Sequence, residues 1–302
     1  MPTKSAKNLL EVIQALSSPM EPEPTAQEAK LQKLDDIGAV IFDVYGTLFQ
    51  SGVGDISLSD KGAIDREAAI RDAFEAAGFR LTDSGINPLA TLFGETLAAH
   101  QDIRRGDDVD NPEVDVLQVW EDYLDQLAAF EVFEGAVTPH STKAVAVHFE
   151  CRVNPVWPMP GMQDCLAALR QREVPLSIIS NAQFFTPLLF PALLDQPLGS
   201  LGFAEKACVW SYELRRAKPS LSLFETSAEY FEKQDGLKPQ DILYVGNDML
   251  NDIYPASHIG FRTALFAGDL RSLRLREDRP ECAEVKPDLV LTQLDQLVGC
   301  LF

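Results

Sequence analysis

Four polar stretches carry residue types that suit catalysis, and each lies at or beyond the end of a short apolar run. They are Asp43, Ser180-Asn181, Lys218-Pro219 and residues 246–252. The apolar runs before three of them have the length and composition of strands buried in a parallel sheet. The carboxyl ends of such strands meet at one edge of the sheet, where open α/β sheets bind their ligands. We therefore expect the four stretches to form one site.

The side chains in these stretches suit the transfer of a phosphoryl group. The carboxylate of Asp43 can attack phosphorus to form an aspartyl phosphate, which divides one difficult displacement into two easier steps. Beyond the nucleophile, catalysis of phosphoryl transfer depends mainly on positioning the substrate and neutralising its charge. We therefore expect Lys218 to balance the charges of Asp43 and the phosphate. The predicted substrate-binding residues are Thr47, Ser180, Asn181 and Lys218. Taken singly, an Asp after a strand often caps a turn, and most lysines lie at the surface.

Asp248 and Asp252 form a candidate metal site. They stand four residues apart at the start of a predicted helix, where acids also complement the helix dipole. The functional alternative is a Mg²⁺ site shared with Asp43, because magnesium prefers oxygen ligands and few protein carboxylates. The ion would neutralise charge on the phosphoryl oxygens. We predict that Asp248 binds Mg²⁺ directly and that Asp252 binds it directly or through water.

The elements that must position these residues alternate between strands and helices. In residues 36–56 and 156–302 this alternation predicts an α/β core, a Rossmann-like parallel sheet with helices on both faces. Residues 57–155 instead show apolar residues at helical spacing in four stretches, with no convincing strand between them. The sequence therefore predicts an all-helical domain inserted just after the first strand. Within it, Asn111-Pro112-Glu113 is a predicted helix start.

Residues 1–35 are predicted to be an appendage to the core. A helix at residues 6–16 is followed by a Pro- and Glu-rich segment, which is typical of a linker. The formal net charge of −20 opposes binding to nucleic acid and anionic membranes. No apolar run reaches the roughly 18 residues of a membrane span, and the five cysteines form no CxxC pair. We expect a soluble cytoplasmic protein with free thiols; its oligomeric state is open.

In their order and strand context, the four stretches resemble the four motifs of the haloacid dehalogenase superfamily. The resemblance covers residues 36–300 and places the helical insert where that family carries a cap domain. It implies a hydrolase that acts on a small phosphate ester and uses Mg²⁺. The implied catalytic residues are Asp43, Tyr45, Ser180 and Lys218. The implied metal ligands are Asp43, the backbone carbonyl of Tyr45, Asp248 and Asp252. Asn247 stands where many members have an acid and is expected as a further ligand or a supporting group.

Tyr45 is the main departure from the phosphatases of that family. Those enzymes usually carry, two residues after the nucleophile, a second Asp that acts as general acid and base. A tyrosine, with an ordinary pKa near 10, is a poor base at neutral pH. Tyr45 is similar instead to the 2-haloacid dehalogenases, which attack carbon and need no metal, so such a hydrolase is the alternative. Asn247 also departs from the family pattern, which has an acid at this position in many members. A catalytically weak phosphate-binding regulatory protein is therefore the third interpretation.

Overall fold

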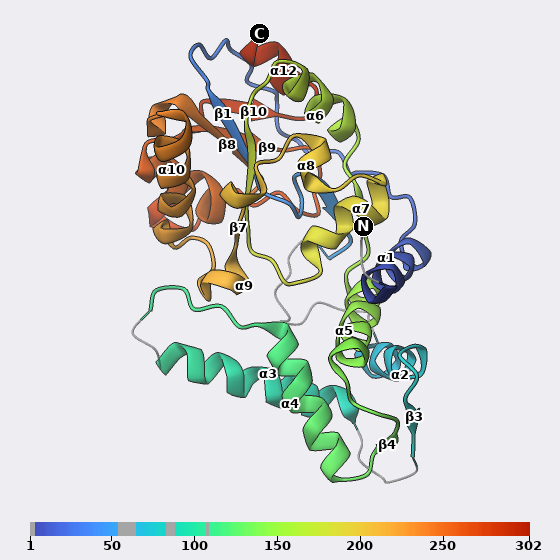
Figure 1. Ribbon diagram of the computed structural model, residues 1–302. Helices are drawn as coiled ribbons and strands as arrows, with labels where there is room; N and C mark the ends of the chain where they lie inside the picture. Colours follow the sequence, from blue (N-terminus) through green and yellow to red (C-terminus); the bar gives the residue numbers. More distant parts are fainter. Residues whose placement is uncertain (1–3, 54–64, 83–87, 107–108) are drawn as a thin grey trace.

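A six-stranded parallel sheet forms the centre of the computed structural model, which describes residues 4–53, 65–82, 88–106 and 109–302 (Figure 1). The strand order is β10-β9-β8-β1-β6-β7. The strands are β1 (Ala39–Phe42), β6 (Leu176–Ser180), β7 (Val209–Trp210), β8 (Ile242–Gly246), β9 (Arg262–Phe266) and β10 (Leu289–Leu291). The predicted α/β class with a Rossmann-like parallel sheet is confirmed.

Strand β1 lies between β6 and β8, so it delivers Asp43 to the middle of the sheet edge. All four residues of β1 are buried. Val40 and Phe42 pack into one hydrophobic cluster, whereas Ala39 and Ile41 pack into another on the opposite face. Alternate side chains of a strand point to opposite faces, and both faces are covered here, which explains the unbroken apolar run.

Helices cover both faces of the sheet. One face packs against α6 (Met162–Gln171), α7 (Leu189–Leu194), α8 (Leu198–Leu201) and α12 (Gln296–Leu301). The other face packs against α10 (Leu221–Asp235) and α11 (Tyr254–Ile259). Figure 1 shows α10 and α6 on opposite sides of the sheet. A short helix, α9 (Ser211–Leu214), directly follows β7.

The described residues between 66 and 153 form a helical segment with a hydrophobic cluster of its own, and Figure 1 shows it below the sheet. Its helices are α2 (Arg66–Ala76), α3 (Leu89–Gly106), α4 (Val116–Ala129) and α5 (Pro139–Val153). Phe74, Trp120 and Tyr123 are buried at the centre of the cluster. The predicted boundary between residues 56 and 57 lies outside the described residues.

Two short antiparallel pairs accompany the helical segment, although the sequence predicts no strand there. β2 (Phe49–Ser51) pairs with β5 (Val156–Pro158) where the chain leaves and re-enters the core. β3 (Arg80–Leu81) pairs with β4 (Phe133–Glu134) at the far end. Two- and three-residue strands are too short to show a periodic pattern, so only contacts between distant parts of the chain reveal them.

The predicted helix start at residues 111–113 is wrong. α4 begins at Val116, after Asp115 accepts a hydrogen bond from the backbone N–H of Leu117. Pro112 instead forms an isolated antiparallel bridge with Arg216 of the core. Asparagine followed by proline suits a helix start and a turn equally well, and pairing with the core decided the outcome.

The N-terminal residues pack closely against the rest of the molecule. Helix α1 (Lys4–Leu16) buries Leu9 and Ile13 in the hydrophobic cluster that also contains residues of α7. The following extended segment stays on the core, where the N–H of Lys30 donates to the carbonyl of Val290 at 2.9 Å. The apolar side of α1 therefore packs on the core. None of the described helices is long and apolar enough to cross a membrane.

Candidate active site

Asp43 stands at the carboxyl end of β1 and is held there by the turn that follows. Its backbone N–H donates to the carbonyl of Val245 at 2.9 Å, which extends the β1–β8 ladder by one bond. Gly46 lies in this turn with φ +84°, and a Cβ built there would come within 2.5 Å of the Ser272 side chain. Glycine is therefore required, both for its backbone conformation and for the close approach.

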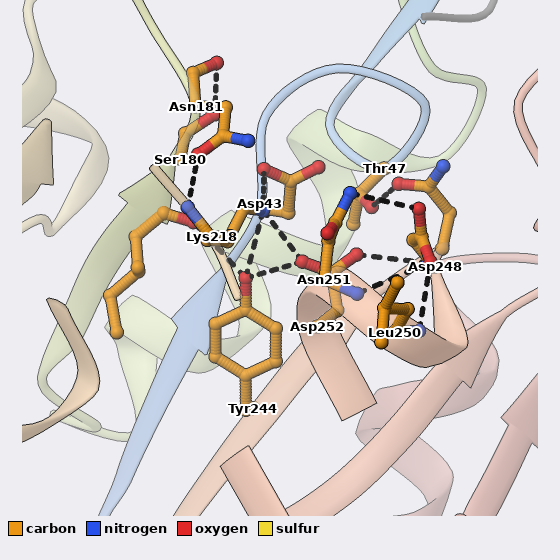
Figure 2. A network of polar contacts seen from close by, with 12 residues as sticks. Asp43, Thr47, Ser180, Asn181, Lys218, Tyr244, Asp248, Leu250, Asn251 and Asp252 are labelled. Carbon is orange, nitrogen blue, oxygen red and sulfur yellow. Dashed lines mark hydrogen bonds and ion pairs between the residues drawn. The ribbon is translucent and has the colours of Figure 1, made fainter. Parts of the chain in front are cut away.

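Lys218 bridges two buried carboxylates, as Figure 2 shows. Its Nζ lies 2.7 Å from Oδ1 of Asp43 and 2.6 Å from Oδ1 of Asp252. Burial alone would lower the pKa of the ammonium, but Asp252 and Asp43 raise it above its ordinary value. Lys218 is therefore charged at neutral pH, and the three groups together carry a net charge of about −1 when both acids are ionised.

Asn181 positions Lys218, whereas Ser180 is turned into the core. The side-chain oxygen of Asn181 accepts the backbone N–H of Lys218 at 2.7 Å. Ser180 is fully buried, and its hydroxyl lies 3.3 Å from the carbonyl of Asn181. Of these two predicted substrate-binding residues, only Asn181 lines the cavity next to Asp43.

Asp252 reaches the cluster through one turn of π-helix at Met249–Ile253. π-Helical turns are rare and occur frequently at functional sites. Asp252 accepts hydrogen bonds from the ammonium of Lys218, the hydroxyl of Tyr244 at 2.9 Å and the backbone N–H of Asp248 at 2.9 Å. Burial raises the pKa of its carboxyl to about 6, against the opposing effect of Lys218. Sequence analysis missed Tyr244, because it lies within an apolar strand and carries no motif.

Asp248 and Asn247 turn toward the loop at residues 269–276. The carboxylate of Asp248 accepts two bonds from the guanidinium of Arg276, at 3.0 and 2.6 Å, and also caps the backbone of the π-helical turn. The Asn247 side chain accepts the Thr47 hydroxyl at 3.1 Å and donates to the Ser272 carbonyl at 2.6 Å. Thr47 is thereby engaged within the protein and does not line the cavity.

The predicted metal ligands line one cavity, and their oxygen chemistry suits Mg²⁺. Asp43, Tyr45, Asn247 and Asp248 all line the same cavity. Magnesium needs only one or two carboxylates when water and substrate phosphate complete its shell. Within the described residues no group of three acids, histidines or cysteines converges on one point. The chemistry of these residues therefore fits a magnesium site with few protein carboxylates. The carboxylate of Asp248 is also paired with Arg276.

The hydroxyl of Tyr45 is engaged away from the Asp43–Lys218 pair. It lies 2.9 Å from the hydroxyl of Thr186. Burial, together with the nearby carboxylate of Glu150, raises the pKa of the Tyr45 phenol well above 10. The side chain therefore neither donates nor accepts a proton readily at neutral pH, so the backbone of Tyr45 is the part suited to the site.

Glu150, on α5, should make the folded protein less stable as the pH rises. Burial raises the pKa of its carboxyl from 4.5 to about 7, so its favourable effect is present below pH 4.5 and is lost as pH rises through 7. We expect Glu150→Gln to stabilise the protein by about 1–3 kcal/mol at pH 8 and by little at pH 4.5. Urea unfolding at both values tests this, with the exposed Glu121→Gln as control; an equal effect at both pH values would contradict it.

A cavity of about 270 Å³ lies above the Asp43–Lys218 pair, between the core and the helical segment. From the helical segment and its loop come Leu97, Gln101, Glu113, Val114 and Val116. The buried core residue Gln183 holds this loop, because its side chain donates to the Val114 carbonyl at 3.0 Å and accepts the Val116 N–H at 2.9 Å. The sequence gives no signal for Gln183, and it marks Glu113 only as part of a predicted helix start, not as a residue of the site.

Comparison with known proteins identifies the family and the fold. The family model for haloacid dehalogenase-like hydrolases matches residues 37–260. A 2-haloacid dehalogenase from Pseudomonas syringae pv. Tomato is 18% identical, with a TM-score of 0.53 over 87% of this chain and 97% of that one. A predicted phosphoglycolate phosphatase from Haemophilus somnus is 19% identical, with a TM-score of 0.45 over 87% and 97%. No curated protein matches the chain. At these identities the structural likeness concerns the fold alone.

Proposed function

The chain belongs to the haloacid dehalogenase-like hydrolases, and from that premise we propose that it is a Mg²⁺-dependent phosphatase of small phosphate esters. The observation that carries the proposal is the buried Asp43–Lys218–Asp252 cluster beneath a cavity. One oxygen of Asp43 is bound to Lys218, and within the described part of the chain the other accepts no hydrogen bond. A carboxylate held by one oxygen and open at the other is oriented for attack.

The residues of the cluster then have separate roles. The open oxygen of Asp43 attacks phosphorus and forms an aspartyl phosphate, which water later hydrolyses. Lys218 holds one oxygen of Asp43 and places positive charge beside the phosphoryl oxygens. Asp252 and Asn181 hold Lys218 in place, from its ammonium and its backbone respectively.

The proposed magnesium ligands are Asp43, the Tyr45 carbonyl and Asp248. Asp252 would bind directly or through water, and Asn247 is a further oxygen donor beside them. When bound, the ion would supply positive charge to the phosphoryl oxygens. Arg276 already neutralises Asp248, so we propose that magnesium binds weakly here and draws part of its coordination from the substrate.

Phosphate release should depend on Mg²⁺. With 4-nitrophenyl phosphate and a panel of small phosphate esters, we expect turnover in Mg²⁺ and a rate lower by about 10²-fold or more in EDTA. A metal ion contributes several kcal/mol to stabilising such a transition state. The measurement is release of inorganic phosphate. Equal rates in Mg²⁺ and EDTA would exclude the metal, and no release from any ester would exclude the phosphatase.

One observation favours a second candidate, a metal-independent dehalogenase-like hydrolase. Arg276 occupies the Asp248 carboxylate, and Tyr45 replaces the second acid, so the site is already partly neutralised without a metal ion. Halide release from 2-chloropropionate in EDTA, with no phosphate release from the esters, would support this candidate. Binding of phosphate without turnover in either assay would instead support a regulatory protein.

A further inference from the structure

Glu113 is a carboxylic acid in the cavity that takes no part in the Asp43–Lys218–Asp252 cluster. It comes from the loop before α4 and lines the cavity together with Asp43 and Lys218. Its Oε2 accepts the hydroxyl of Ser211 at 3.0 Å, and its Oε1 accepts the backbone N–H of Val114 at 3.0 Å. The two hydrogen bonds fix the direction of the carboxyl group.

The loop that carries Glu113 is attached to the core just before Lys218. The backbone N–H of Glu113 donates to the carbonyl of Arg215 at 3.1 Å, and that of Ala217 donates to the carbonyl of Asn111 at 2.7 Å. Ser211 in turn bonds both backbone groups of Ala182, next to Asn181. Glu113 therefore stands on the same framework as Lys218 and Asn181, although it is distant from both in sequence.

Hydrolysis of an alkyl phosphate needs a proton for the departing oxygen, because an alkoxide is strongly basic. Within the described residues, the other titratable side chains of the cavity are unsuited to supply it. Tyr45 and Lys218 have raised pKa values, which make them poor donors at neutral pH. Asp248 is paired with Arg276, and Asp252 accepts three hydrogen bonds, so the carboxyl oxygens of both are already engaged within the protein.

The surroundings of Glu113 favour the protonated form of its carboxyl. Burial raises the pKa of its carboxyl, while the bonds from Ser211 and Val114 and the charge of Arg215 oppose the rise. The charged groups around the loop are Arg104 of α3, which donates to the Glu113 carbonyl at 3.3 Å, Arg215 after α9, and Asp115, which pairs with Arg215. The positive charges are partly cancelled by Asp115, so burial dominates.

We propose that Glu113 is the general acid and base of the reaction. This inference rests on the proposed phosphatase function. As Asp43 attacks, the bond from phosphorus to the leaving oxygen breaks, and that oxygen takes both the electron pair and the proton of Glu113. In the second step water attacks phosphorus, its proton passes to the Glu113 carboxylate, and the bond from phosphorus to the Asp43 oxygen breaks. Phosphate leaves, and both acids return to their starting forms.

The test compares leaving groups in Glu113→Gln. With ethyl phosphate we expect kcat/KM to fall by about 10²–10⁴-fold, the usual contribution of a general acid. With 4-nitrophenyl phosphate, whose leaving group is weakly basic, the fall should be less than about tenfold. In the wild type, kcat/KM for ethyl phosphate should decline toward high pH as Glu113 loses its proton, and this decline should be absent from the variant. An equal loss on both substrates, or no loss, would overturn the proposal.

Two further variants separate proton transfer from a structural effect. Glu113→Asp keeps a titratable carboxyl and should retain more activity on ethyl phosphate than Glu113→Gln; equal losses would overturn the proposal. The exposed Glu121→Gln on α4 is the matched control and should leave both activities unchanged. If the proposed phosphatase function is itself wrong, the wild type will release no phosphate from any of the esters in Mg²⁺. That result is distinct from every outcome described for the Glu113 variants.

Discussion

Asp43→Asn should lower the rate of phosphate release by at least about 10³-fold, because loss of a covalent nucleophile has effects of this size or larger. An amide oxygen is a far weaker nucleophile than a carboxylate and cannot form the aspartyl phosphate. The substitution keeps the shape of the side chain, so KM should change much less than kcat. Steady-state kinetics on 4-nitrophenyl phosphate with Mg²⁺ measures both constants.

The same variant should fold normally. Asp43 and Asp252 share one ammonium, so the buried cluster carries an excess negative charge when both are ionised. Removing one of the two charges leaves Lys218 paired with Asp252, and no uncompensated buried charge results. We expect the free energy of unfolding to stay within about 1 kcal/mol of the wild type. Full activity in a folded Asp43→Asn protein would exclude Asp43 as the nucleophile, whichever substrate is used.

Lys218→Met should abolish activity and destabilise the fold by about 3–5 kcal/mol, the usual cost of leaving buried charges unpaired. Lys218 is 6% exposed, and its carboxylate partners Asp43 and Asp252 are 5% and 1% exposed. Without the ammonium, these two carboxylates repel each other in a poorly solvated place. Urea unfolding at pH 8 measures the loss of stability, and phosphate release measures the loss of activity.

The pH dependence of this effect follows from the two acids. The pKa of Asp252 is already raised to about 6 in the presence of Lys218, and it should rise further when the ammonium is removed. Lowering the pH from 8 to 5 therefore protonates Asp252 in the variant and should shrink the stability deficit. A deficit that is the same at both pH values would show that lost packing, rather than unpaired charge, is the cause.

A double variant isolates the electrostatic part of the effect. Adding Asp252→Asn to Lys218→Met removes one of the two unpaired charges and should recover about 1–3 kcal/mol of the loss. Asp252→Asn alone leaves Lys218 paired with Asp43 and should cost less than Lys218→Met. If the two substitutions add independently, Lys218 and Asp252 are not coupled, and the unpaired charge of Asp252 is not a source of the instability.

The sequence pointed to Asp43, Lys218 and Asp252 because the patterns that mark them lie within short stretches of the chain. An apolar run that ends at Asp43 predicts both a buried strand and a polar residue at its carboxyl end, and the structure places Asp43 there. Lys218 and Asp252 likewise follow from the order of strands and loops. Parallel strands must bring their carboxyl ends to one edge of the sheet. Once the strands are recognised, the residues that follow them are therefore expected to lie together.

The direction of the other predicted side chains depends on partners that no local pattern reveals. Asp248 was predicted as a direct metal ligand, yet its carboxylate is held by Arg276, 28 residues further along the chain. Thr47 was predicted to bind substrate, yet its hydroxyl donates to Asn247, 200 residues away. Each bond depends on the loop that packs over the π-helical turn, so the choice of partner is a property of the packed molecule.

The sequence by itself determined the α/β class, the helical segment and the place of Asp43, the proposed nucleophile, because periodicity and residue type are encoded over a few neighbouring positions. Only the tertiary structure decided that the Tyr45 hydroxyl turns to Thr186 and that Glu113 enters the cavity. Both outcomes depend on contacts between segments about 100 residues or more apart. Such contacts form only after the sheet and the helical segment have packed, and burial then sets which acids hold a proton.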